Sequence, residues 1–89
     1  MSSESHVTTD HDHIKNWAEE RDGQPAVVQG TESGNSALLR IDFGEKEANL
    51  KPISWSKFFQ IFDKNNLKFL HSDNETESGK SRFFKFVYQ

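Results

Sequence analysis

Apolar residues recur at helical spacing in the first quarter of the chain. Ile14, Trp17 and Ala18 occupy positions i, i+3 and i+4, so they share one face of a helix. Thr9 precedes this pattern at a position from which its hydroxyl can cap the first turn. The pattern therefore predicts a first helix over residues 10–22.

A second helical pattern follows Ser54, a residue type that commonly caps helices. The aromatic side chains after it fall on one helical face: Trp55, Phe58, Phe59 and Phe62. Asn65 and Asn66 tolerate the left-handed backbone conformation with which helices often end. The sequence therefore predicts a second helix that begins after Ser54 and ends near Asn65.

Apolar and polar residues alternate in the segments expected to form strands. Leu39 and Ile41 alternate with Arg40, which is typical of a strand with one buried face. Polar, glycine-containing loops separate these segments in pairs, so each pair is expected to form an antiparallel hairpin. The expected hairpins join residues 26–30 with 37–43 and residues 67–72 with 81–88.

An internal repeat relates the two halves of the sequence. The tetrapeptide of residues 31–34 recurs as residues 76–79, and the caps and apolar positions on either side align at the same offset. The repeat predicts two αββ units, residues 9–44 and 54–89, neither of which covers its own apolar face. We expect residues 9–89 to form one α+β domain, in which a four-stranded antiparallel sheet carries two helices on one face.

Composition adds an expectation for the amino terminus and excludes several classes of protein. Residues 1–8 are polar apart from Met1 and Val7 and are expected to form a disordered tail, without the pattern of a signal peptide. No apolar run is long enough to span a membrane. The absence of cysteine excludes disulfides and fits a cytoplasmic protein. A net charge of -3 is unlike that of a dedicated duplex-binding protein.

The candidate catalytic and metal-binding residues are few. His11 and His13 lie two residues apart, so they point to different sides of a helix and are not expected to share a metal ion. His71 has no partner acid or nucleophile that the sequence can name. The sequence also lacks a nucleophile elbow, a phosphate loop and a dinucleotide fingerprint. We therefore expect no enzymatic activity, metal or cofactor.

Much of the sequence resembles a family of small bacterial proteins of unknown function. The segments that carry the resemblance span most of residues 11–88: 14–21, 25–27, 30–31, 38–44, 53–63 and 81–87. The resemblance implies a compact bacterial domain and no particular catalytic or binding residue. Some members bear the name 1,4-alpha-glucan branching enzyme, but branching enzymes of the usual kind are large barrel enzymes. At 89 residues the chain is too short for that chemistry.

The outer face of the predicted sheet is the most informative surface. If the alternate side chains from Leu39 to Phe43 and from Phe84 to Tyr88 face the helices, the intervening side chains face away. The outward set mixes apolar with basic side chains: Leu38, Arg40, Phe83, Lys85 and Val87. Arg82 lies at the entry to the last strand, and Lys68 can join from the strand before it.

Three interpretations of this face stay open at the level of sequence. It can be an ordinary half-exposed sheet face, a contact with another protein or a second copy, or a binding surface for single-stranded nucleic acid. We carry forward a small non-enzymatic protein-interaction module, with single-stranded nucleic-acid binding as the alternative. The candidate binding residues are Arg40, Phe83, Lys85, Lys68 and Arg82.

Overall fold

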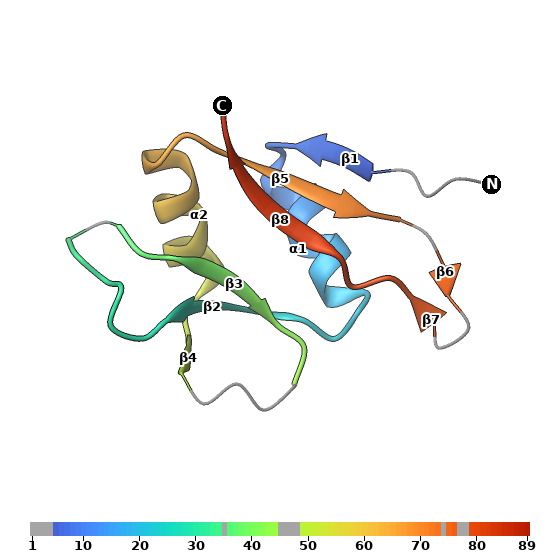
Figure 1. Cartoon of the computed structure of the whole chain (residues 1–89), viewed down its shortest axis with the longest axis horizontal. Coiled ribbons are helices and arrows are strands. Elements are labelled where there is room, and N and C mark those ends of the chain that lie inside the picture. Colours follow the sequence, from blue (N-terminus) through green and yellow to red (C-terminus); the bar gives the residue numbers. More distant parts are fainter. Residues whose placement is uncertain (1–4, 35, 45–48, 74, 77–78) are drawn as a thin grey trace.

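The computed structural model describes residues 5–34, 36–44, 49–73, 75–76 and 79–89. These residues form an α+β structure with two helices and two three-stranded antiparallel sheets (Figure 1). The helices are α1 (His11–Glu19) and α2 (Trp55–Lys64). Neither of these helices is long and apolar enough to cross a membrane.

Each sheet has a central strand that comes directly after a helix. In the first sheet, β5 (Leu67–Ser72) lies between β1 (Ser5–Thr8) and β8 (Phe84–Tyr88). In the second sheet, β2 (Gln24–Val28) lies between β3 (Leu39–Asp42) and β4 (Leu50–Pro52). A short ribbon joins β6 (Glu75–Thr76) with β7 (Gly79–Lys80) in the connection from β5 to β8.

Both helices begin at capped first turns. Ser54 caps α2 as predicted, since its hydroxyl accepts a hydrogen bond from the Lys57 amide at 3.0 Å. For α1 the predicted cap was wrong by one residue, and the helix ends at Glu19, three residues before the predicted end at residue 22. Asp10, not Thr9, is the cap, because its carboxylate accepts from the amides of Asp12 and His13 at 3.0 and 3.3 Å.

The two predicted hairpins are confirmed, and two further strands flank them. β2 pairs with β3, and β5 pairs with β8. β1 adds to β5 with Val7 opposite Leu70, so the disordered tail expected over residues 1–8 is corrected for residues 5–8. Residues 1–4 lie outside the described residues. β4 adds to β2 in a segment for which no strand was predicted.

The described residues do not form the single four-stranded sheet that was predicted. It would need β3 to pair with β8, but each is an edge strand of its own sheet. In Figure 1, β3 and β8 lie side by side in front of the helices, with no ladder between them. The tandem repeat, unlike the sheet, stays a prediction.

The core lies between the sheets and the helices. α2 contacts β5 of one sheet and β2 and β3 of the other, so it bridges the two sheets behind the β3 and β8 edges. The fully buried rings include Phe58 and Phe62 from α2 and Phe69 from β5. Trp17 from α1 packs against Phe69 with ring centroids 5.2 Å apart, which joins the first helix to the same cluster.

The alternation of buried and exposed side chains predicted for β3 and β8 is observed except at the carboxyl end of β8. Leu39 and Ile41 are buried, whereas Leu38 and Phe83 are about half exposed. Phe84 and Phe86 pack against the core, as predicted. Tyr88 was expected to face the helices and does not, because its side chain is 80% exposed.

Candidate functional site

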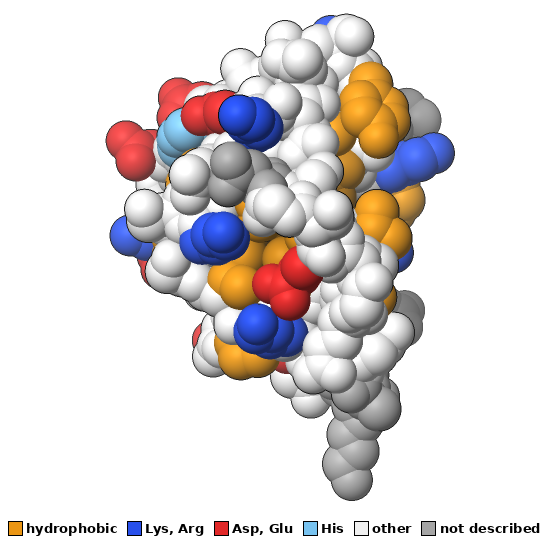
Figure 2. Space-filling view, turned by 90° about the vertical axis from the view of Figure 1, so that its left-hand side faces the viewer, with side chains coloured by type: hydrophobic (Ala, Val, Ile, Leu, Met, Phe, Trp, Pro, Cys, Tyr) orange, Lys and Arg blue, Asp and Glu red, His pale blue; other side chains and the backbone are white. Residues whose placement is uncertain are grey.

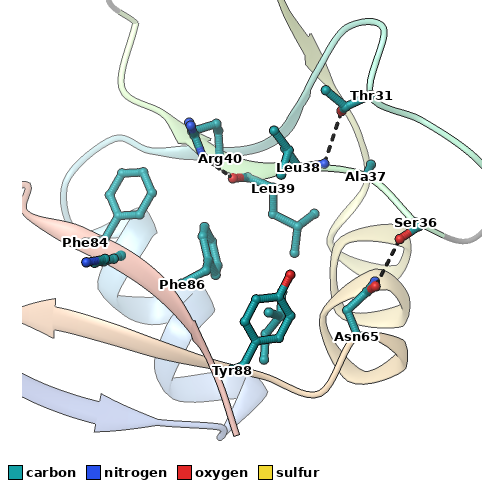
Figure 3. Close-up of a pocket in the computed structure, with 12 residues that line it drawn as sticks. Thr31, Ser36, Ala37, Leu38, Leu39, Arg40, Asn65, Phe84, Phe86 and Tyr88 are labelled. Atoms are coloured by element: carbon teal, nitrogen blue, oxygen red, sulfur yellow. Dashed lines mark hydrogen bonds between the residues drawn. The ribbon is translucent and has the colours of Figure 1, made fainter.

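A cavity lies between the facing edges of the two sheets. Its volume is about 560 Å³, within the range of ligand-binding pockets. The lining comes from β3, β8, the start of β5, the loop before β3 and the carboxyl end of α2: Thr31, Ser36, Ala37, Leu38, Leu39, Arg40, Asn65, Leu67, Phe84, Lys85, Phe86 and Tyr88. In Figure 3 the Tyr88 ring projects from β8 toward Leu39 of β3.

A smaller hollow of about 190 Å³ continues the cavity toward the other end of the two strands. The two hollows share Arg40 and Phe84. The remaining lining of the smaller hollow is Ile41, Asp42, Phe43, Leu50 and Arg82. We call the two hollows together the β3–β8 groove.

Some of the backbone amides and carbonyls of β3 point toward the groove. The Val28 amide donates to the Leu38 carbonyl at 2.9 Å, so Leu38 belongs to a hydrogen-bonded pair with β2. Bonded and non-bonded pairs alternate along an antiparallel ladder. Leu39 and Ile41 therefore direct their amides and carbonyls away from β2, toward the groove. The Leu39 carbonyl accepts a hydrogen bond from the Arg40 guanidinium at 3.0 Å.

The backbone of β8 presents the opposite edge in the same way. The Ser72 amide donates to the Phe83 carbonyl at 3.2 Å, and the Gln89 amide donates to the Asn66 carbonyl at 2.9 Å. These bonds fix the alternation along β8, so Lys85 and Val87 bond to β5. The amides and carbonyls of Phe84, Phe86 and Tyr88 consequently point toward the groove, where no strand of the described residues pairs with them.

Side chains give the groove an apolar floor and a basic outer border. Leu39, Phe84 and Phe86 belong to or pack against the core. Arg40 and Lys85 come from the alternate positions of β3 and β8, so they lie on the outer side and are exposed. On the face shown in Figure 2, hydrophobic side chains lie beside lysine and arginine side chains along the right-hand border.

Hydrogen bonds hold one end of the groove in place. The Thr31 hydroxyl donates to the Val28 carbonyl at 2.6 Å and accepts from the Leu38 amide at 3.1 Å. The Ser36 hydroxyl donates to the side-chain oxygen of Asn65 at 3.0 Å, which ties this loop to the carboxyl end of α2 (Figure 3). The loop before β3 is therefore fixed to both the strand and the helix that border the cavity.

The structure brings three of the five predicted binding residues to the groove. Arg40 and Lys85 line the larger hollow, and Arg82 lines the smaller one, with its guanidinium 5.5 Å from the centre of the Phe43 ring. Lys68 lies on β5 opposite Val87 and does not line the groove. Phe83 is 51% exposed next to the amino end of β8 and also lies outside the lining.

The structure also contains a histidine–aspartate pair that was not predicted from the sequence. His71 is buried in β5, and its Nδ1 lies 2.8 Å from Oδ1 of Asp73. The rings of His6 and His13 lie 5.8 and 5.0 Å from the His71 ring. The two-residue spacing of His71 and Asp73 was the only signal in the sequence, and it is too common to predict a pair.

Burial sets the protonation of this histidine. Loss of solvation lowers the pKa of His71 below its ordinary value, although the carboxylate of Asp73 acts in the opposite direction. Its Nε2 is buried without a hydrogen-bond partner among the described residues. The fold therefore favours the neutral imidazole, which has no desolvated charge.

The two histidines of the first helix have different neighbours. His11 Nε2 lies 2.9 Å from Oδ1 of Asp63, and its ring stacks on Phe59 with centroids 4.1 Å apart. His13 lies instead beside His71. Within the described ranges no group of three or more histidine or carboxylate side chains is arranged to hold a metal ion.

Comparison with protein-family models, with curated proteins and with solved structures finds no match for this chain. The resemblance to small bacterial proteins therefore stays a prediction.

Proposed function

We propose that the chain is a small non-enzymatic protein-interaction module that binds its partner along the β3–β8 groove and the surface beside it. The observation that supports this best is the pair of facing sheet edges, bordered by exposed apolar and basic side chains. Leu38, Phe83 and Tyr88 are large hydrophobic side chains with at least half of their surface exposed. Exposed apolar groups gathered near a cavity are typical of binding surfaces.

The chemistry of the groove supports binding rather than catalysis. Its charged side chains are mainly arginine and lysine, which hold anions but are poor general acids or bases near neutral pH. The His71 and Asp73 pair is the most enzyme-like arrangement among the described residues, and neither residue lines the groove. Because His71 is almost fully buried, a substrate would have little access to it.

The tandem repeat remains part of this proposal. What supports it is the equivalent position of the two central strands, β2 and β5, each of which follows a helix and precedes an edge strand of the groove. In each sheet the other edge strand comes from the opposite half of the chain. A cytoplasmic location is likewise a proposal, supported by a sequence without cysteine.

Affinity capture with matched variants tests the function. The tagged protein, Phe83→Ser and Lys85→Glu are compared for the proteins they retain from lysate of the native host, with Gln60→Ser as the control. Gln60 lies exposed on α2, away from the groove lining. We expect a partner to be retained by the wild type and Gln60→Ser and lost by the other two. Equal retention by all four proteins contradicts the proposal.

Titration with a mixed single-stranded oligonucleotide tests the alternative function. Amide NMR shifts at residues 38–42, 68 and 80–87 that diminish as salt rises would favour nucleic-acid binding. Arg40 and Lys85 would then contact phosphate, with exposed Phe83 or Tyr88 stacking on bases. An unchanged spectrum removes this alternative and leaves protein interaction.

A further inference from the structure

We propose that the β3–β8 groove binds an extended segment of a partner protein, with alternating apolar and acidic side chains, which adds as a strand along β8. This inference rests on the proposed function and specifies the partner's chemistry. Addition of a strand to an exposed sheet edge is a known mode of peptide recognition, in which backbone hydrogen bonds provide affinity. Three residues of β8 direct their backbone groups toward the groove, namely Phe84, Phe86 and Tyr88.

The hollow beside β8 gives the incoming strand a place. Strands pair about 4.8 Å apart, so a new strand along β8 must occupy the space toward β3. That space is the cavity of about 560 Å³. The hydrogen bonds of Thr31 and Asn65 fix the loop at one end, so that part of the lining is already ordered before binding.

The floor and the border of the groove specify alternating side chains. Successive side chains of a strand point to opposite faces. On one face the incoming side chains would meet Leu39 and Phe86, which belong to the core side of the groove. On the other face they would meet Arg40 and Lys85. Apolar residues suit the first face and carboxylates suit the second.

Charge selects an acidic partner over a basic one. The described lining of the groove carries three basic side chains, those of Arg40, Lys85 and Arg82, against the single carboxylate of Asp42. This local excess of positive charge contrasts with the net charge of -3 of the whole chain. A second copy of this acidic chain is therefore less complementary to the groove than an acidic segment of another protein.

The test uses a defined probe, an acetylated and amidated eight-residue peptide of alternating glutamate and valine. We expect amide hydrogen exchange at Phe84, Phe86 and Tyr88 to slow by about tenfold or more at saturation, because these amides gain hydrogen bonds. The amides of Lys85 and Val87 already bond to β5 and should change little. Binding without this alternating protection would overturn the proposal, as would absence of binding at millimolar peptide.

Modified probes separate backbone pairing from charge. The same peptide with alternate backbone nitrogens methylated keeps its charge but loses half of its donors, so we expect it not to bind. An oligothymidylate of similar charge should leave the exchange of the three amides unchanged. Equal protection by either probe would show that charge alone accounts for binding.

Charge reversal on the protein completes the test. Arg40→Glu and Lys85→Glu should each weaken peptide binding about fivefold, whereas Lys15→Glu on α1 should have little effect. A probe with lysine in place of glutamate should regain affinity for the double variant. Equal affinity of all variants for the acidic probe would contradict the selection by charge.

Two further results distinguish this inference from the proposed function. If affinity capture still shows a partner that depends on Phe83 and the peptide does not bind, the module binds by another surface contact and the strand-addition inference is wrong. If sedimentation shows a dimer whose Phe84 and Phe86 amides are already protected, a second copy occupies the groove and the inference is likewise wrong.

Discussion

At the residue scale, the buried side chain of His71 is expected to make the stability of the fold depend on pH. It lies in β5, with Asp73 on its own segment, His6 facing it from β1, and His13 facing it from α1. Protonation would place a positive charge in a nearly inaccessible site with two other imidazoles nearby. The neutral form is therefore the form that the fold accommodates.

This burial predicts a loss of stability in mild acid. The pKa of His71 is lowered in the folded protein, so below its ordinary value near 6.5 the unfolded chain binds a proton that the folded chain does not. The free energy of unfolding is thus expected to be highest above pH 6.5 and to fall as the pH falls below it. Urea unfolding at a series of pH values from 8 to 5 measures this dependence.

Two variants assign the effect to this residue. His71→Phe should flatten the pH dependence, because the aromatic ring can still stack on Phe69 without a titrating group. His11→Ala removes a more exposed histidine and should leave the dependence in place. A fall in stability that persists unchanged in His71→Phe would refute the assignment.

The sequence predicts the positions of some polar residues and not of others. Arg40 and Lys85 could be placed on an outer face because period-two alternation alone decides it. Arg21 gave no such signal, yet it is buried, with Nε donating to the Ser81 carbonyl at 2.6 Å and its guanidinium 4.3 Å from the centre of the Trp17 ring. The contact with Ser81 joins residues 60 positions apart in sequence, so it depends on the tertiary fold.

At the scale of elements, β1 is held to the first sheet by a few ladder bonds that can be tested one at a time. β5 bonds to β8 through Lys68 and Leu70, so its alternate residues, including His71, face β1. The amide of His6, opposite His71, therefore belongs to the ladder, whereas the amide of Val7 points outward.

A pair of proline substitutions tests this register. His6→Pro should lower the free energy of unfolding by about 1–3 kcal/mol more than His6→Ala does, because proline removes a ladder donor as well as the side chain. Val7→Pro should cost clearly less than His6→Pro, since an outward amide on an edge strand is dispensable. Chemical denaturation of the three variants measures these differences. A greater loss from Val7→Pro would show that the register is shifted by one residue.

The elements that sequence predicted are those with their own periodic signal. The helices and the two hairpins carry apolar residues at regular spacing, and all four appear. β1 and β4 are short and mostly polar, and Pro52 within β4 argues against a strand when read alone. Pro52 lies opposite Ala26, whose backbone bonds to β3, so the missing donor falls on the outer edge.

At the scale of the whole molecule, one apolar core connects both helices with both sheets. Phe69 lies at its centre, fully buried, with ring centroids 5.2 Å from Trp17 and 5.5 Å from Phe86. Phe83 lies immediately before β8 and is half exposed. Substitutions of these two phenylalanines therefore test stability and surface binding separately.

Their substitution has sharply different expected effects. Phe69→Ala should reduce the free energy of unfolding by about 3–5 kcal/mol, through lost contacts and the cavity left behind. Phe83→Ser should change it by less than about 1 kcal/mol, since much of its ring already faces water. Thermal and urea unfolding compare the two variants. A large loss in Phe83→Ser would identify Phe83 as a packing residue and remove it from the binding surface.

The single sheet predicted from the repeat was wrong because local pattern does not determine which edges meet. Alternation within β3 and β8 is the same whether they pair with each other or border a cavity. In the structure α2 contacts both sheets, and β1 and β4 form their other edges. The groove, which is the candidate site, could therefore not be predicted from sequence, although several of its side chains were.

The strand order also has a kinetic consequence. β1 is the first strand and pairs with β5, whereas β4 follows β3 in sequence but pairs with β2. Ser5 meets Ser72 in the register of β1 and β5, so the first sheet closes only after most of the chain has been brought back on itself. Neither half can complete its own sheet without a strand from the other. Folding should therefore be slow for a chain of this size, with both sheets forming in one cooperative step.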